Sequence, residues 1–140
     1  MTSKNLKNED SELLTPNTTG DTIASLVESK LGCPYEWGAA GPDSFDCSGL
    51  TYWAHQQVGI SIPRTEQDQA QEGEEVSIDD LQPGDLLFYD CAGEGNISHV
   101  TTFVGGTSMI HAPEEGDVVK YADLTSGYWS ERFMTARRLW

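Results

Sequence analysis

The sequence predicts a single α+β domain in which helices precede an antiparallel sheet, and three observations support this prediction. The chain has 140 residues, which is enough for one hydrophobic core and too few for two domains. Apolar residues recur at helical spacing between 21 and 59, whereas short alternating or apolar runs follow from 86 onward. Helical segments followed by strand segments are typical of the α+β class.

The first 20 residues are polar and have no periodic apolar pattern, so we predict a disordered tail there and a folded domain over 21–140. A first helix is indicated by apolar residues at helical spacing, namely Ile23, Leu26, Val27 and Leu31. Asp21 or Thr22 can cap its start, and Gly32 can end it.

A second helix is expected after a loop rich in proline and glycine. Leu50, Ala54 and Val58 fall on one helical face. Cys47 lies in the first turn, directly after Asp46, which can cap the helix. A cysteine in this place is either a buried apolar residue or a nucleophile, and a lone buried cysteine is more often the former.

The second half of the chain predicts strands. The Pro83-Gly84 turn signal precedes a short apolar run, and the later segments alternate between apolar and polar residues or follow glycine turns. We predict strands at 86–89, 99–104, 108–112, 118–121 and 133–139.

The charge of the chain excludes several classes of partner. Eight basic and 23 acidic residues give a formal charge of −15, which repels nucleic acid and anionic membranes. No apolar run of about 18 residues is present, so we expect no membrane insertion. Residues 1–10 lack the apolar stretch of a secretory signal peptide. A solvated acidic surface is expected to keep a small protein monomeric.

Three cysteines, Cys33, Cys47 and Cys91, leave at least one thiol unpaired and share no CxxC spacing. The pattern therefore indicates neither a disulfide framework nor a zinc site, although a single bridge between Cys33 and Cys91 stays open. We expect no metal and no cofactor.

A thiol is a good nucleophile only as the thiolate, which a helix N-terminus and a nearby imidazolium stabilise. Cys47 meets the first condition. His55 lies eight residues along the same helix, about 12 Å away at 1.5 Å per residue, and is expected to be a surface residue. His99 and His111 lie on successive predicted strands joined by a glycine turn, where two imidazoles can lie side by side.

The placement of these two histidines depends on the hairpin loop. A two-residue loop at Gly105-Gly106 would place His99 and His111 on opposite faces of the sheet. A three-residue loop, with Val104 opposite Ser108, would place both on one face. We therefore predict the three-residue loop, with one of the two glycines in the left-handed conformation.

Five segments in this order carry a family resemblance, namely CPYEWGAAGPDSFDCSGLTYW, GISIPRTEQDQ, LQPGDLLFY, ISHVTTFVGGTSMIHAP and YWSERFMTARRLW. Over residues 21–140 the chain resembles the NlpC family of bacterial cell-wall cysteine peptidases. The resemblance implies a papain-like fold, in which a helix bearing the nucleophile packs on an antiparallel sheet. It also implies that Cys47 is the nucleophile, His99 the general base and then acid, and His111 the residue that orients His99.

Further roles follow from the same resemblance. Tyr35 would place its hydroxyl near the thiol and the developing oxyanion. Asp46 and Ser48 match positions that bind the amino end of the stem peptide, although a helix cap is an equally good interpretation of Asp46. Thr101 stands where the family commonly has glycine, and on the face of both histidines its side chain could narrow the substrate groove.

The implied reaction is hydrolysis of peptidoglycan stem peptides between D-γ-glutamate and the diamino acid, through an acyl-enzyme, in the cell wall or periplasm. Because no signal peptide is seen, a phage lysin, an injected effector and a segment of a longer secreted protein all fit. An effector would require an immunity protein in the producing cell.

Two alternatives stay open. The first is a papain-like amidase or acyltransferase that acts on a different amide, and Tyr35, Asp46 and Ser48 favour the peptidase over it. The second is a noncatalytic wall-binding module, which usually lacks one residue of the triad. All three triad residues are present here.

Overall fold

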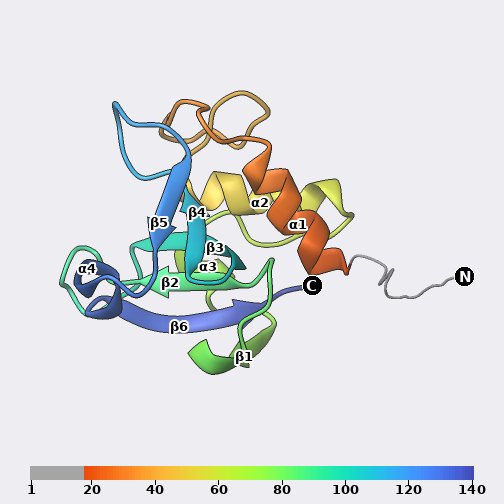
Figure 1. Ribbon diagram of the computed structural model, residues 1–140. Coiled ribbons are helices and arrows are strands. Elements are labelled where there is room, and N and C mark those ends of the chain that lie inside the picture. Colours follow the sequence, from red (N-terminus) through yellow and green to blue (C-terminus); the bar gives the residue numbers. More distant parts are fainter. Residues whose placement is uncertain (1–17) are drawn as a thin grey trace, which may run out of the picture.

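The computed structural model describes residues 18–140, which form a six-stranded antiparallel sheet with α1 and α2 packed on one face (Figure 1). Residues 1–17 of the tail predicted at 1–20 lie outside the described residues. For residues 18–20 the prediction is wrong, because they form the N-cap and the first two residues of α1. The helices are α1 (Thr19–Glu28), α2 (Cys47–Gln57), α3 (Glu66–Gln69) and α4 (Gly127–Ser130), with a 3-10 turn at Ile78–Asp80. The strands are β1 (Glu74–Val76), β2 (Leu86–Tyr89), β3 (His99–Gly105), β4 (Ser108–His111), β5 (Lys120–Asp123) and β6 (Phe133–Arg138). The predicted α+β class is confirmed.

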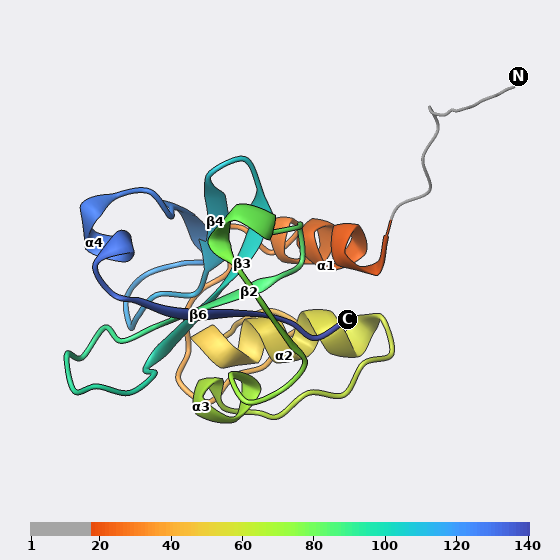
Figure 2. The ribbon, with the colours of Figure 1, turned by 90° about the horizontal axis from the view of Figure 1, so that it is seen from below.

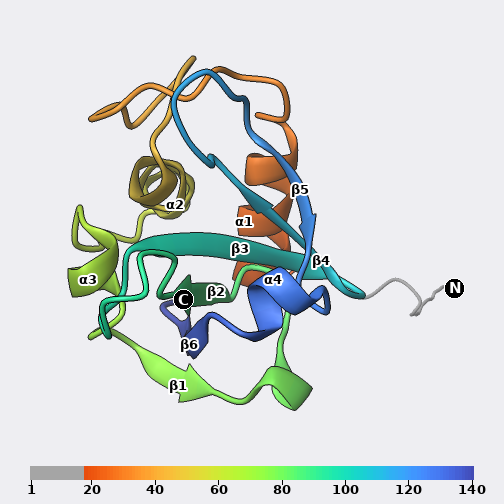
Figure 3. The ribbon, with the colours of Figure 1, turned by 90° about the vertical axis from the view of Figure 1, so that its left-hand side faces the viewer.

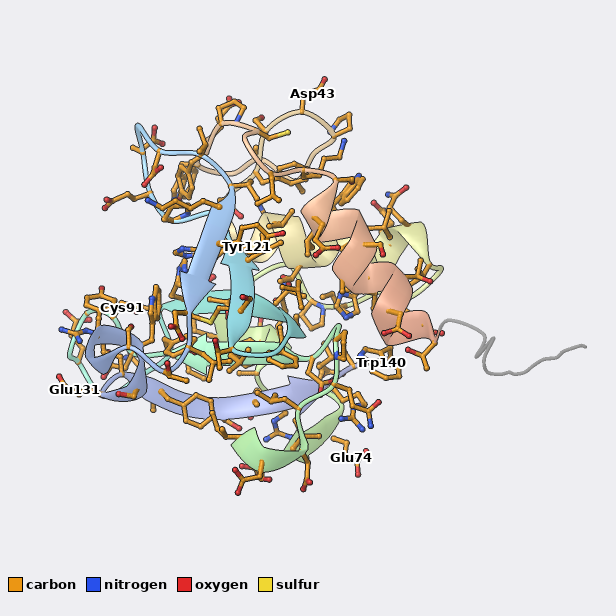
Figure 4. All side chains as sticks on the ribbon, viewed as in Figure 1. Asp43, Glu74, Cys91, Tyr121, Glu131 and Trp140 are labelled. Atoms are coloured by element: carbon orange, nitrogen blue, oxygen red, sulfur yellow. The ribbon has the colours of Figure 1, made fainter. Side chains whose placement is uncertain are left out.

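Helix α1 begins slightly earlier than the sequence predicts. Thr18, rather than Asp21 or Thr22, is the N-cap, and Asp21 completes a capping box: its N–H donates to Thr18 Oγ1 at 3.0 Å and its carboxylate accepts from the Thr18 N–H at 3.1 Å. Gly20 follows in the first turn, where a Cβ atom would overlap the indole of Trp140. The C-terminus of the chain can therefore lie against this turn (Figure 4).

Helix α2 buries the apolar face that the sequence predicts. Leu50 and Ala54 pack against α1 and the adjoining strands. The expectation for His55 is wrong, because its side chain is fully buried and its Nδ1 lies 2.8 Å from the carbonyl oxygen of Thr51. His55 follows Thr51 by one helical turn, so it shares the buried side of the helix. Burial lowers the pKa of His55, which keeps the ring neutral.

The sheet separates two parts of the core, and Figures 2 and 3 show that α1 and α2 cover only one of its faces. On that face lie the side chains of Leu86, Phe88, Val100 and Ile110. The opposite face carries Leu87, Tyr89, Phe103, Met109 and Ala136, which pack with Trp129 and Phe133. The alternation follows the two-residue period of a strand.

The hairpin between β3 and β4 gives the predicted register by a different local structure. Thr102 pairs with Ile110 and Phe103 with Met109, which places His99 and His111 on the same face. However, Gly105, not Val104, lies opposite Ser108, so the turn has two residues and an irregularity falls between Phe103 and Gly105. Gly105 and Gly106 both have positive φ, at 120° and 61°, whereas the sequence predicts a left-handed conformation for one of them. The bulge supplies the one-residue shift that we assigned to a longer loop.

Strand order in the sheet is β1-β6-β2-β3-β4-β5. Strand β1, which the sequence analysis did not predict, pairs with β6 at one edge. The short helices α3 and α4 were missed as well, because four-residue helices are too short to show a 3.6-residue period. The expected strand at 118–121 begins two residues later, at Lys120.

One buried ion pair joins β6 to the turn before β2. The guanidinium of Arg138 donates to both carboxylate oxygens of Asp85, each at 2.8 Å, and Asp85 is fully buried. The Asp85 carboxylate also accepts from the N–H of Gln82 at 2.9 Å. The pair therefore holds the C-terminal strand against the Pro-Gly turn.

Replacing Arg138 by Met is expected to lower the free energy of unfolding by about 3–5 kcal/mol, because the Asp85 carboxylate would stay buried without its partner. Urea denaturation of both proteins would measure the change. Arg132→Met is the matched control, since this arginine stacks on the exposed Tyr128 ring, and its cost should be about 1 kcal/mol or less. A loss below 1 kcal/mol for Arg138→Met would contradict the role assigned to the pair.

Within residues 18–140 the three cysteines are free. Cys33 packs beside the helical core, whereas Cys91 packs on the opposite face of the sheet, so the bridge left open by the sequence does not form. None of the described helices is long and apolar enough to cross a membrane.

Candidate active site

Cys47 lines a cavity of about 260 Å³. The thiol is placed there because Asp46 caps α2, which makes Cys47 the first residue of the helix. Four parts of the chain meet around it: the loop before α2 with the first turn of that helix, helix α3, the start of β3, and the segment that follows β4. The lining residues are Tyr35, Trp37, Asp46, Cys47, Ser48, Glu66, Ser98, His99 and Pro113. Five of the six site residues predicted from the sequence therefore surround one cavity.

The sixth, His111, reaches the site through His99. The Nε2 atom of His99 lies 2.8 Å from Nδ1 of His111, and both side chains are buried. Their planes are nearly perpendicular, at 82°. Because one ring nitrogen of His99 is engaged with His111, its Nδ1 is the nitrogen left for the thiol.

Trp129 covers the two histidines, and sequence reasoning did not identify it. Its indole stacks on His99 with ring centroids 5.7 Å apart and meets the His111 ring edge-on at 5.3 Å. The residue comes from α4, some thirty residues beyond His99, so no local pattern connects the two. The indole shields the histidine pair from water on the face opposite the helices.

Burial keeps the histidines uncharged. It lowers the pKa of His99 to about 3, and the neighbouring His111 adds to the shift. Burial also lowers the pKa of His111 to about 4, with Lys120 acting in the same direction and Asp117 opposing it. Both rings are therefore neutral at physiological pH.

The thiol is likewise neutral at rest. Burial raises the pKa of Cys47 to about 12, and the carboxylates of Glu66 and Asp46 add to the rise. The backbone N–H groups of Val100 and Ser48 act against it. The sequence analysis expected the helix N-terminus and an imidazolium to favour the thiolate, but desolvation and two nearby carboxylates outweigh that effect.

The carboxylate of Asp46 is already fully engaged. It accepts from the N–H groups of Gly49 at 2.6 Å and Gly38 at 2.9 Å. It also forms an ion pair with Arg64 at 2.8 Å. The same guanidinium donates to the hydroxyl of Ser48 at 2.9 Å. Arg64, which sequence reasoning missed, therefore neutralises Asp46 and ties it to Ser48.

Helix α3 is fixed against α2 by a buried glutamine. Gln69 is fully buried and donates to the carbonyl oxygens of Ser48 at 3.2 Å and Pro63 at 2.8 Å, while its own oxygen accepts from the Thr51 hydroxyl at 2.8 Å. Glu66 begins this helix, and its Oε1 lies 4.0 Å from Cys47 Sγ. The Thr65 cap and its partner Asp68 are the sequence signal that would have found α3.

Thr101 does not narrow this cavity, so the expectation for it is wrong. Its side chain is fully buried, and its hydroxyl lies 3.1 Å from the sulfur of Met109. It lies on the same face of the sheet as Tyr89, whose hydroxyl also contacts the Met109 sulfur.

A second, larger cavity of about 640 Å³ adjoins the first, with Ser98, His99 and Pro113 lining both. It continues past His111 to the ion pair of Lys120 and Asp117, in which Lys120 Nζ lies 2.8 Å from Asp117 Oδ2. Among residues 18–140 no group of three or more His, Cys, Asp and Glu side chains is arranged to hold a metal ion.

Comparison with known proteins relates this arrangement to one family. The model of the NlpC/P60 family matches residues 32–138. A γ-D-glutamyl-L-lysine dipeptidyl-peptidase of Bacillus subtilis is 41% identical over 121 residues, which cover 86% of this chain and 41% of that protein. A probable endopeptidase of Corynebacterium glutamicum is 50% identical over 96 residues, covering 68% of this chain and 43% of that protein.

A solved structure, NlpC2 of Trichomonas vaginalis, superposes with a TM-score of 0.82 at 36% identity, covering 90% of this chain and 48% of that one. The chain thus spans less than half the length of the relatives described here.

Proposed function

The chain belongs to the NlpC/P60 family, and from the arrangement of Cys47, His99 and His111 we propose that it is a cysteine peptidase of peptidoglycan. The proposed reaction is hydrolysis of the bond between D-γ-glutamate and the diamino acid of the stem peptide. The printed activity of the Bacillus subtilis relative, a γ-D-glutamyl-L-lysine dipeptidyl-peptidase, supports this choice of bond. The proposed place of action is the cell wall or periplasm.

The observation that carries the proposal is the contact between the two buried histidines beside the thiol. In the tautomer proposed here, His99 Nε2–H donates to His111 Nδ1. His99 Nδ1 then carries a lone pair toward the cavity that Cys47 shares with it. This is the relation between nucleophile, base and orienting group that acyl transfer requires.

Because the Cys47 thiol and the His99 imidazole are both neutral before the reaction, the first step includes a proton transfer between them. As Cys47 Sγ attacks the γ-carbonyl carbon, its proton passes to His99 Nδ1, and the carbonyl oxygen becomes an oxyanion. Collapse of this intermediate breaks the C–N bond, and His99 gives its proton to the leaving α-amine. A water molecule, deprotonated by His99, then attacks the thioester, which releases the carboxylate and restores the thiol.

The oxyanion would lie at the start of α2. The N–H groups of Cys47 and Ser48 belong to the first turn, where helical N–H groups have no intrahelical partner. Tyr35 lines the same cavity, and burial followed by the nearby Cys47 raises the pKa of Tyr35. Its hydroxyl therefore stays protonated and can donate to the oxyanion.

Asp46 and Ser48 remain the proposed contacts for the amino end of the stem peptide. Because Asp46 is paired with Arg64, the ammonium group would meet a neutral ion pair rather than a free carboxylate. We propose that the hydrogen-bonded Asp46, Ser48 and Arg64 define the shape of this end of the cavity.

Mass spectrometry of purified muropeptides tests the proposal. Diaminopimelate-type and lysine-type muropeptides are incubated with the protein, with heat-denatured protein as the control. Fragments that end in D-γ-glutamate, together with the complementary fragment beginning at the diamino acid, are expected from at least one type. If neither type is cleaved by folded protein, the proposal is wrong, and an enzyme for a different amide becomes the better assignment.

The pH dependence of kcat/KM should reflect the buried histidine pair. The pKa of His99 is lowered, so the ring loses its function as a base only when the pH falls well below the ordinary value of about 6.5. We expect kcat/KM to stay on its plateau down to about pH 5, measured with a soluble muropeptide in constant ionic strength. An acid limb centred between pH 6 and 7 would contradict the neutral thiol and imidazole pair.

A further inference from the structure

Resting on the proposed function, we infer that Glu66 is a specificity-determining residue that makes the enzyme prefer stem peptides whose D-glutamate carries an α-carboxamide over those with a free α-carboxylate. The proposal concerns the acyl half of the substrate, which must lie beside Cys47 during the reaction. Glu66 and Cys47 line the same cavity, and the Glu66 carboxylate lies 4.0 Å from the thiol sulfur.

Hydrogen bonds from α3 to α2 and to the segment before β3 fix the position of Glu66. Gln69 anchors α3 to α2 through buried hydrogen bonds. Gln67, the residue after Glu66, donates to the carbonyl oxygen of Ile97 at 3.0 Å, just before β3. Helix α3 therefore bridges the segment of the nucleophile and the segment of the histidine, and the half-buried Glu66 side chain lies between them.

The charge of Glu66 is not balanced by a neighbour. Arg64, two residues earlier, is paired with Asp46 at 2.8 Å. Within residues 18–140 no lysine or arginine forms an ion pair with Glu66, and the cavity lining contains no lysine or arginine, only the neutral imidazole of His99. Glu115, which accepts from the N–H of Trp37 at 3.3 Å, adds further negative charge at the cavity edge. The acyl half thus enters a site with net negative potential.

The chemistry of the substrate makes this potential selective. A γ-linked D-glutamate keeps its α-carboxyl group, which is separated from the scissile carbonyl carbon by three carbon atoms and four bonds, roughly 5 Å in an extended chain. Because the Glu66 carboxylate lies 4.0 Å from the thiol sulfur, a carbonyl carbon under attack by that sulfur holds the α-carboxyl group within roughly 12 Å of Glu66, with about 8 Å as a middle value. An ionised carboxylate is repelled by Glu66 over this range, whereas a carboxamide is neutral and is not repelled.

The expected preference follows from Coulomb's law. For two unit charges about 8 Å apart, effective dielectric constants between 80 and 20 correspond to a discrimination of about 2- to 30-fold in kcat/KM. The preference should shrink at higher ionic strength, because added salt screens partly exposed charges.

The test uses two synthetic tetrapeptides that are identical except at one group, L-alanyl-γ-D-glutamate and L-alanyl-γ-D-isoglutamine, each linked to the same diamino acid and D-alanine. Both have a free amino end, so any attraction of that ammonium to Glu66 is common to the pair. Wild-type protein is expected to cleave the isoglutamine peptide about 2- to 30-fold more efficiently, and Glu66→Gln should bring the ratio close to one.

Asp68→Asn is the matched control, because it removes the same charge from the same short helix at an exposed position outside the cavity. It should leave the ratio unchanged. Effects of Glu66→Gln on the thiol itself change both rates equally and cancel in the ratio. The wild-type ratio is informative even without a folded variant.

The outcomes separate this inference from the proposed function. Equal cleavage of both peptides by wild type, or a preference that survives Glu66→Gln, would overturn the role of Glu66 and leave the peptidase assignment intact. Cleavage of neither peptide would overturn the peptidase assignment and, with it, this inference.

Discussion

Cys47→Ala is expected to lower kcat/KM for muropeptide hydrolysis by at least about 10⁴-fold, because Cys47 is the only thiol among residues 18–140 that lines the cavity. The substitution should not unfold the protein. Cys47 is the first residue of α2, where alanine is tolerated, and the Asp46 cap keeps its partner, the N–H of Gly49. Circular dichroism and the urea midpoint would establish that the variant is folded.

Substitution of the other two cysteines provides the controls for Cys47→Ala. Cys33 and Cys91 are free, partly buried and outside the cavity of Cys47. Cys33→Ser and Cys91→Ser should therefore change kcat/KM less than about threefold, even where they cost some stability. A variant of either that loses as much activity as Cys47→Ala, while folded, would contradict the assignment of the nucleophile.

His99→Ala is expected to lower kcat/KM by about 10³- to 10⁴-fold. With the pKa of Cys47 raised to about 12, the thiol cannot ionise without a base, and His99 is the imidazole that lines its cavity. Steady-state kinetics with a soluble muropeptide would measure the loss. Because the two residues act as one unit, the double variant with Cys47→Ala should be no worse than Cys47→Ala alone.

His111→Ala tests whether His111 acts by positioning His99 rather than by reacting itself. His111 touches His99 but does not line the cavity of the thiol, so its loss should cost about 10²-fold. It should also move the acid limb of kcat/KM toward ordinary histidine values, because His111 contributes to the lowered pKa of His99. A purely structural role would reduce activity without moving that limb. His55→Gln, which alters a buried histidine far along α2, is the control for general effects of a lost imidazole.

Much of the fold and most of the site could be predicted because the informative patterns are local. The segment from Leu86 to Tyr89 is a short continuous apolar run, the residues after His99 alternate with a strand period of two, and Cys47 directly follows the cap of its helix. The register of β3 and β4 was predicted correctly, but from the demand that the two histidines share a face. The sequence could not distinguish a longer loop from a two-residue turn with a bulge, since both produce the same one-residue shift.

The features that escaped prediction depend on contacts distant in sequence. Trp129 stacks on His99 from a four-residue helix, and Arg64 reaches Asp46 from 18 residues away. His55 was expected at the surface once its distance along the helix excluded it from the site, yet it lies on the same buried side of α2 as Thr51. The pKa of Cys47 was expected to fall because the helix N-terminus is visible in the sequence, whereas the opposing desolvation and Glu66 become visible only in three dimensions.

Covalent labelling with an L-alanyl-γ-D-glutamyl chloromethyl ketone, followed by peptide mapping and an activity assay, tests the central claim most directly. The reagent places an electrophilic carbon beside the acyl half of the proposed substrate. We predict one equivalent of label per chain, on Cys47, incorporated in step with the loss of hydrolysis and slowed by excess muropeptide. Full hydrolytic activity after stoichiometric labelling of Cys47 would contradict the claim that this thiol attacks the stem peptide.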